Sequence, residues 1–208
     1  MASLKMTSEQ FTNNLALSFQ KINIAPLINE YIKTIEDNDK PWEFTKVNWK
    51  FNLGIKKDKK TILKEWIVFE MFLLRQQILI YFKGNQIGNK IVSAFTRLCV
   101  DRFIEYNIFN VNDDFENLLS SRYTYYLNAV KDLKDLDPDC ILSFSRSITD
   151  QLCRGQGNIL YNTLIVKYYF DTSDMYRKLI NGLMKDVILV EQTNNDQPPF
   201  SKKKREEK

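Results

Sequence analysis

The chain contains no histidine and only three cysteines among its 208 residues. Histidine is the side chain that most often serves as a general base or a metal ligand near neutral pH, so its absence argues against both roles. The sequence also lacks the GxxxxGK[ST] and GxGxxG loops and a nucleophile elbow. We therefore expect no enzyme activity, no metal site and no cofactor.

The three cysteines, Cys99, Cys140 and Cys153, lie in apolar or helical stretches without CxxC spacing. This pattern is typical of reduced thiols in a cytosolic protein rather than of disulfides or a zinc site. The first ten residues contain no continuous apolar segment, so we expect no secretory signal.

Glycine and proline are scarce, at 6 and 5 residues, and no repeat of fixed period is visible. The apolar residues recur mostly at helical spacing, and with 14 phenylalanines and 10 tyrosines the chain can fill a sizeable core. These features together predict an all-α fold.

Long apolar runs are also absent: the longest is the five residues Ile78–Phe82, whereas a membrane-spanning helix needs roughly 20. Residues 61–83 nevertheless predict a helix that is apolar nearly all round, because its few polar side chains do not gather on one face. Such a helix is either a membrane span or the axis of a globular core, and the short runs favour the core. We expect the other elements to pack around this central helix.

A general excess of positive charge is missing from the body of the chain. The net charge is +4, but residues 202–208 contain five basic and two acidic residues, which leaves +1 for residues 1–201. If the body binds a polyanion, it must therefore do so through a local groove where cations are segregated from acids. Residues 191–208 are polar and predict a disordered basic tail.

The N-terminal segment predicts a helix with a larger apolar surface than a solvated terminal helix needs. Residues 7–10 form a capping-box pattern, and Phe11, Leu15, Phe19 and Ile22 follow it as an apolar stripe. Pro26 predicts the start of a second helix, with Ala25 as the joint. The stripe has two explanations: the helix packs on its own core, or it is an arm that docks on a neighbouring subunit.

Two stretches on either side of the central helix have clear patterns. Residues 47–55 alternate strictly between apolar and polar, which predicts an extended segment, although no partner strand is evident nearby. Residues 90–106 predict an amphipathic helix whose polar side carries Lys90, Arg97 and Asp101. That polar stripe is either an ordinary solvated face or part of a binding surface.

The next predicted helix begins after Asn112-Asp113-Asp114 and runs to about residue 134. Its apolar line includes Arg122, and arginine is seldom buried unless it is paired. Arg122 either snorkels to the surface or meets a carboxylate, or else it faces an anionic ligand, with the rings of Tyr123, Tyr125 and Tyr126 beside it.

The C-terminal part predicts three more helices. One starts at Asp137-Pro138 and shows Arg146, Asp150 and Arg154 on its polar side, where Arg146 and Asp150 could simply form an exposed pair. A second helix is expected at 158–170, and Ser173 is expected to cap a last helix that reaches about residue 189. Residues 137–139 also contain two carboxylates that a nuclease could use, but a Pro-Asp helix start explains them more simply.

Four blocks of sequence together resemble one family. They are Ile78-Leu79-Ile80-Tyr81-Phe82-Lys83-Gly84-Asn85 with Lys90-Ile91, Asp113-Asp114 with Leu119-Ser120-Ser121-Arg122, Leu142-Ser143-Phe144-Ser145-Arg146 with Leu152-Cys153-Arg154-Gly155, and the basic and apolar run 175–189. In this order the blocks are similar to the nucleoprotein of phleboviruses and tenuiviruses, which are segmented negative-strand RNA viruses. The similarity covers roughly residues 78–189.

The resemblance implies an all-helical fold of two lobes that close on a groove for single-stranded genomic RNA. It implies a homo-oligomer, ring or chain, held by an N-terminal arm, with the viral polymerase as a further partner. The location would be the virion ribonucleoprotein and the host cytoplasm. On this basis we expect an arm at 1–24, an N-terminal lobe at 25–110, a C-terminal lobe at 111–190 and the tail at 191–208.

The sequence thus predicts a nucleoprotein that encapsidates RNA without sequence specificity. The expected RNA-binding residues are Lys83, Asn85, Lys90, Arg97, Arg122, Tyr123, Tyr126, Arg146 and Arg154, and the expected arm contacts are Phe11, Leu15, Phe19 and Ile22. Lysine, arginine and aromatic side chains suit phosphates and base stacking rather than base-edge recognition. The alternative is a helical adaptor or assembly protein that has no nucleic-acid ligand.

Overall fold

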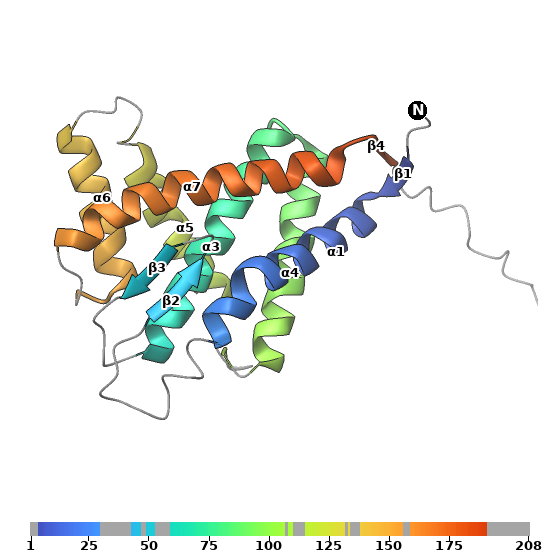
Figure 1. The fold of residues 1–208 in the computed structure, drawn as a ribbon. Coiled ribbons are helices and arrows are strands. Elements are labelled where there is room, and N and C mark those ends of the chain that lie inside the picture. Colours follow the sequence, from blue (N-terminus) through green and yellow to red (C-terminus); the bar gives the residue numbers. More distant parts are fainter. Residues whose placement is uncertain are drawn as a thin grey trace, which may run out of the picture.

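The fold is all-α, as the sequence predicts, with two short two-stranded sheets (Figure 1). The computed structural model describes residues 4–29, 43–46, 49–52, 59–106, 108–109, 115–131, 133, 138–155 and 159–190. The elements are β1 (Leu4–Thr7), α1 (Ser8–Phe19), η1 (Gln20–Ile24), β2 (Glu43–Lys46), β3 (Trp49–Asn52), α3 (Lys59–Tyr81), α4 (Gln86–Glu105), α5 (Phe115–Lys131), α6 (Pro138–Leu152), α7 (Ile159–Met184) and β4 (Val187–Val190).

Helix α3 is the axis of the core, which confirms the predicted central helix. It contacts α4, α5, α6 and α7, and Trp66, Phe69 and Phe72 on it are fully buried. A helix apolar on all sides can be covered only if other helices surround it, and Figure 1 shows α3 in the middle of the molecule.

Helix α7 is held to α3 by a buried carboxylate. Glu70 of α3 is completely buried and accepts hydrogen bonds from the hydroxyls of Tyr168 and Tyr176, which lie about two turns apart on α7. The predicted break between residues 170 and 173 is therefore wrong, because one continuous helix spans Ile159–Met184. Ser173 lies inside this helix, where tertiary contacts outweigh its capping preference.

The hydrophobic core does not divide at the predicted lobe boundary. One contiguous cluster of buried side chains extends from Phe11 to Ile180, and α7, which was assigned to the C-terminal lobe, packs along α3. Figure 1 shows α5 and α6 at one end of the molecule and α1 with α4 toward the other. The expected segments 25–110 and 111–190 thus share a single core.

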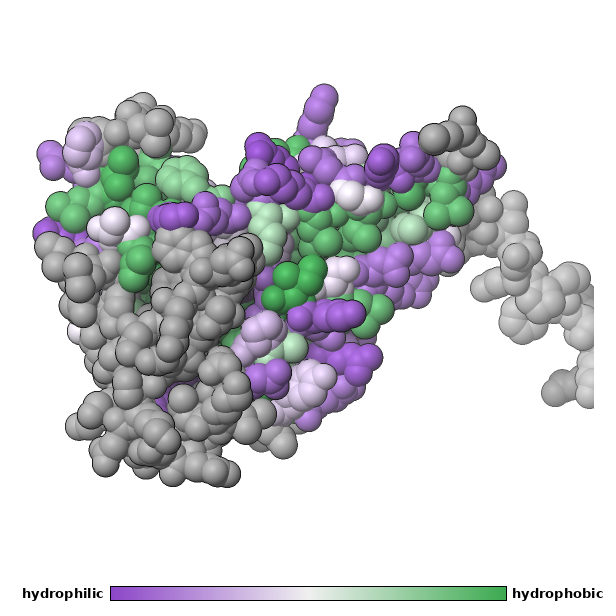
Figure 2. Space-filling model, in the orientation of Figure 1, coloured by the Kyte–Doolittle hydropathy of each residue, from purple (hydrophilic) through white to green (hydrophobic). Residues whose placement is uncertain are grey.

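Helix α1 packs on its own chain. Its capping box is formed as predicted, with Gln10 N donating to Thr7 Oγ1 and Thr7 N donating to Gln10 Oε1. Phe11, Leu15 and Phe19 are fully buried against α4 and α7, with the rings of Phe19 and Phe95 5.2 Å apart. Figure 2 shows the resulting surface, with hydrophilic side chains along the outer sides of α1 and α7 and hydrophobic ones between them.

These contacts correct the assignment of the arm residues. Of the four side chains expected to face a neighbour, only Ile22 is exposed, at 43%. The structure therefore agrees with the other explanation of the stripe, in which the helix covers its own core. Exchange of this helix between subunits stays a prediction.

The chain has no break at Ala25, the predicted joint between two helices. The helix continues through residues 25–29, and η1, directly after α1, is a π-helical turn in which Ala25 N donates to Gln20 O. Pro26 lacks an N–H and its ring would clash with the carbonyl oxygen four residues earlier in an α-helix. A π turn placed just before Pro26 is a known way to relieve such a conflict without ending the helix.

The two sheets correct two further expectations. Strand β3 falls within the predicted extended segment 47–55, and its antiparallel partner, which the sequence did not indicate, is β2. Strand β4 pairs in parallel with β1, so residues 187–190 are a strand and not the end of the last helix. Three β-branched residues among Val187–Val190 favour this ending after the turn at Asp186, whose φ is 59°.

None of the described helices is long and apolar enough to cross a membrane. All three cysteines are free thiols, as expected, and burial raises the pKa of Cys153 to about 12.

Candidate nucleic-acid interface

The turn between α3 and α4 has a geometry set by its two glycines. Lys83 and Gly84 both have positive φ, 50° and 63°, and Gly84 N donates to Leu79 O at 2.8 Å, which closes the end of α3. Gly88, in the first turn of α4, lies against Phe82: a Cβ at that position would be 2.7 Å from Phe82 Cβ. Because Gly88 has no side chain, the first turn of α4 can pack directly against Phe82 at the end of α3.

Asn85 is the N-cap of α4, and its expected contact with RNA stays a prediction. Its Oδ1 accepts a hydrogen bond from Gly88 N at 2.9 Å, so the role of this residue in the structure is to start the helix. The N-terminal end of the α4 dipole, which is positive, consequently lies beside Lys83.

A row of exposed cations accompanies α4. Lys83 precedes the helix, and Lys90 and Arg97 lie seven residues apart on one of its faces, about 10 Å along the axis. We call these three residues the cation row. Residues 71–100 contain four basic residues and no aspartate or glutamate, so the row lies in a stretch that carries the full net charge of the chain.

Lys90 and Arg97 line a groove between α1 and α4. The groove has a volume of about 390 Å³, and its other lining residues are Ser8, Glu9, Thr12 and Asn13 from α1 and Ile91, Ala94, Leu98 and Asp101 from α4. Two cations, two carboxylates, two hydroxyl groups and one amide thus border a cleft that apolar side chains of α4 also line. Asp101 lies in the last turns of α4, and Glu9 lies in the first turn of α1, the end at which Phe11 meets Phe82 of the α3–α4 turn.

Arg122 is paired with a carboxylate of the central helix. Its Nε and Nη2 donate to the two carboxylate oxygens of Glu65 at 2.8 and 2.7 Å, and these hydrogen bonds raise the pKa of the guanidinium. The side chains of Arg122 and Glu65 are only 24% and 6% exposed. The carboxylate partner, one of the explanations for Arg122, is therefore confirmed, and contact of Arg122 with RNA stays a prediction that this pairing disfavours.

Tyr126 cannot offer its ring to a base, whereas Tyr123 is partly exposed. Tyr126 is completely buried between Phe69 and Phe72, with ring centroids 5.0 and 5.3 Å apart. The hydroxyl of Tyr123 is also buried, and burial raises the pKa of both tyrosines. The burial of Tyr126 corrects its predicted stacking role, and the role of Tyr123 stays a prediction.

Arg146 and Arg154 are exposed, as predicted, but they do not lie on the helix that carries Lys90 and Arg97. Arg146 lies on α6 and Arg154 in the turn after it, with a positive φ of 52°. Neither forms an ion pair with a described residue, so the exposed pair of Arg146 with Asp150, which was the alternative to a binding role, is not made. Helix α6 packs on α5 and α7, away from α4 (Figure 1), so these two arginines and the cation row do not form one groove.

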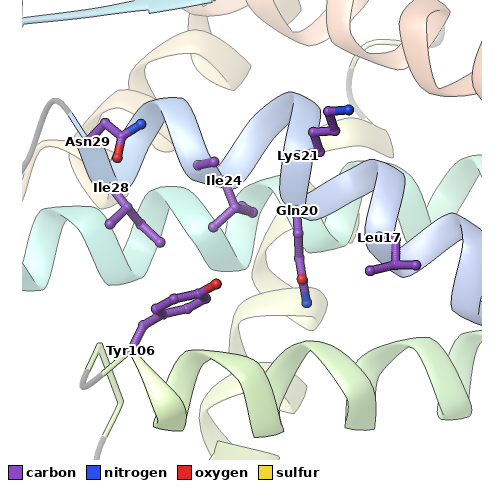
Figure 3. A pocket seen from close by; sticks show the side chains of 8 residues that line it. Leu17, Gln20, Lys21, Ile24, Ile28, Asn29 and Tyr106 are labelled. Carbon is purple, nitrogen blue, oxygen red and sulfur yellow. The ribbon is translucent and has the colours of Figure 1, made fainter.

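A second groove, of about 370 Å³, is mainly apolar. Figure 3 shows it between the helical run that contains η1 and the end of α4, with Tyr106 facing Ile24 and Ile28 across the gap. Leu17 and Tyr106 on its border are 59% and 58% exposed. No sequence pattern indicates this groove, because Tyr106 follows the end of α4 and Leu17 belongs to α1.

Comparison with known protein families, curated proteins and solved structures found no match for this chain. Among the described residues there is also no cluster of acidic and cysteine side chains that could hold a metal ion. The candidate interface therefore depends on its own geometry and charge.

Proposed function

We propose that this protein binds single-stranded RNA without sequence specificity, through phosphate contacts of the cation row. The observation that carries the proposal is the spacing of three exposed cations: Lys83, Lys90 and Arg97 lie within thirty residues of sequence that contain no acid, although Glu9 and Asp101 border the same groove as Lys90 and Arg97. Cations at fixed spacing on a helix suit a polyanion, since each phosphate that is neutralised releases counterions. A solvated helix face is the competing explanation, and it predicts no nucleic-acid affinity.

The nature of the RNA and its setting come from the resemblance to nucleoproteins of phleboviruses and tenuiviruses. In this proposal the ligand is a viral genomic strand, the assembly is a ribonucleoprotein of the virion and host cytoplasm, and the viral polymerase is a partner. Lys83 and Lys90 belong to the block of sequence that carries this resemblance. The protein has no catalytic role in the proposal.

The test compares two double variants with the same change in net charge. Lys90→Ala/Arg97→Ala removes two cations of the row, and Lys167→Ala/Lys178→Ala removes two that are paired with Asp171 and Asp174 on α7. If each row cation neutralises one phosphate of a single strand, the first variant should bind RNA about 25-fold more weakly at about 0.1 M salt. The control should bind within about threefold of wild type.

The dependence of RNA affinity on salt tests the same proposal independently. Three phosphate contacts predict a slope of about −2 in a plot of log K against log salt, which means a loss of about 20-fold between about 50 and 200 mM. An affinity that does not change over this range would contradict the proposal.

Oligomerisation by exchange of α1 belongs to the same proposal. An exchanged helix would make with a neighbour the contacts that Phe11, Leu15 and Phe19 make here within one chain. The mass of the intact protein, measured by light scattering with and without RNA, is the test. A monomer under both conditions, with RNA bound, would reject the exchange and leave RNA binding in place.

The alternative function is that of a helical assembly protein without a nucleic-acid ligand. The apolar groove with Leu17 and Tyr106 at its border favours it, since exposed apolar clefts are typical of protein contacts. This alternative predicts that purified protein carries no nucleic acid and that Leu17→Asp, but not Lys90→Ala/Arg97→Ala, abolishes association with its partner.

A further inference from the structure

The α3–α4 turn presents an exposed aromatic ring next to the cation row. Tyr81, the last residue of α3, is 40% exposed although it lies within the longest apolar run of the chain. Its neighbour Ile80 is 64% exposed, so the two side chains form a small apolar surface at the edge of the helix. Lys83 follows two residues later, in the same turn.

The ring of Tyr81 is supported by a rigid underlayer. It packs edge to face against Phe82, with centroids 5.0 Å apart and planes at 70°. Phe82 in turn contacts Phe11 of α1 at 6.0 Å and lies against Gly88, where no larger side chain fits. A ring fixed in this way offers stacking area at a low cost in conformational entropy.

Two other aromatic rings among the described residues are similarly exposed, but neither suits a phosphate chain. Tyr106 borders the apolar groove at the opposite end of α4. Phe170 lies on α7 near Lys167, whose charge is already paired with Asp171 at 2.9 Å. Tyr81 alone of these three adjoins cations that belong to the acid-free stretch.

We propose that Tyr81 is a stacking platform for an unpaired base, while Lys83 and the rest of the cation row hold the adjoining phosphates. This inference rests on the proposed function and adds recognition of the base, which phosphate contacts cannot provide. Stacking needs a base face that is free, so the site should prefer single strands over duplexes and over polyanions that have no bases. It requires no base-edge hydrogen bonds and therefore no sequence preference.

The test uses wild-type protein, Tyr81→Ala, Tyr81→Phe and the matched control Tyr106→Ala. Each is titrated with a single-stranded RNA oligonucleotide, the same RNA as a duplex, and inorganic polyphosphate. Tyr81→Ala should bind the single strand about 5- to 150-fold more weakly, which corresponds to the loss of one stacked base. Binding of polyphosphate should not change, and Tyr81→Phe and Tyr106→Ala should both behave like wild type.

The other outcomes separate the two proposals. If wild type binds neither RNA nor polyphosphate, the proposed function fails. If wild type binds both and Tyr81→Ala still binds the single strand normally, only the stacking site is refuted. An equal loss of both ligands in Tyr81→Ala would show a structural role for the ring, and a loss in Tyr81→Phe would show that the hydroxyl acts instead. Thermal unfolding of each variant establishes that it is folded at the assay temperature.

Discussion

Replacing Arg122 by methionine should destabilise the protein and leave RNA binding intact. The guanidinium makes two hydrogen bonds with Glu65, whose side chain is only 6% exposed, so the variant leaves a carboxylate with almost no access to water. Breaking a fully buried ion pair costs about 3–5 kcal/mol. Because the side chain of Arg122 is 24% exposed and the pair is therefore only partly buried, we expect the free energy of unfolding to fall by less, about 2–3 kcal/mol.

This loss can be measured by thermal and urea unfolding followed by circular dichroism. For a chain of this size, about 2–3 kcal/mol corresponds to a decrease in Tm of about 4–12 °C. The double variant Glu65→Met/Arg122→Met removes both charges and substitutes apolar side chains of comparable length. It should return to within about 1 kcal/mol of wild type, because two uncharged side chains carry no desolvation penalty.

Two results would refute this reasoning. If the destabilisation by Glu65→Met and Arg122→Met were simply additive, the two side chains would not be coupled in solution. If Arg122→Met kept the wild-type Tm but lost RNA affinity, the guanidinium would contact phosphate rather than Glu65. RNA binding must be measured well below the Tm of each variant so that the two effects remain separate.

Three further predictions concern the core and the turn. Tyr176→Phe removes one of the two hydroxyls that donate hydrogen bonds to Glu70. It should lower the free energy of unfolding by about 1–3 kcal/mol in urea titrations. Burial raises the pKa of Tyr126 well above its ordinary value, so its stabilising contribution is complete below about pH 10 and is lost as the pH rises further. The hydroxyl of Tyr126 has no hydrogen-bond partner, so Tyr126→Phe should match wild type at pH 7 and lose less stability in alkaline unfolding titrations. Gly88→Ala places a Cβ 2.7 Å from Phe82 Cβ and should cost about 1–3 kcal/mol in the same urea assay, and a variant as stable as wild type would contradict the close approach.

Elements whose causes are local could be predicted from the sequence. The capping box at Thr7 and Gln10, the central helix and the helix start at Pro138 all depend on residues within one or two turns, and all are present. Strand β4 and the unbroken α7 could not be predicted in this way. They depend on β1 and on Glu70, which lie about one hundred residues or more away in the sequence.

The same distinction between local and distant causes applies to the residues of the candidate site. Arg122 was correctly singled out as a charge on an apolar line, but its partner Glu65 is 57 residues away, and nothing local indicated it. The cation row could be found from the spacing of Lys90 and Arg97 alone. The exposure of Tyr81 could not, because an apolar run of five residues gives no sign of which side chain reaches the surface.

The distribution of charge leads to the last prediction. The net charge is +4, residues 71–100 carry +4 and residues 202–208 carry +3, so the rest of the chain sums to −3 and cannot attract a polyanion as a whole. Removal of residues 202–208 and the triple replacement of Lys83, Lys90 and Arg97 by alanine both lower the net charge by three.

If affinity depends only on net charge, these two variants should bind RNA equally. We expect instead that the triple variant loses about 100-fold at about 0.1 M salt, because three phosphate contacts at fixed positions disappear together with their counterion release. The truncated protein should retain most of its affinity and most of its salt dependence, as measured by fluorescence anisotropy with a labelled oligonucleotide. Abolition of binding by truncation, with the triple variant unaffected, would place the RNA contacts in the tail and remove the role of the α4 face.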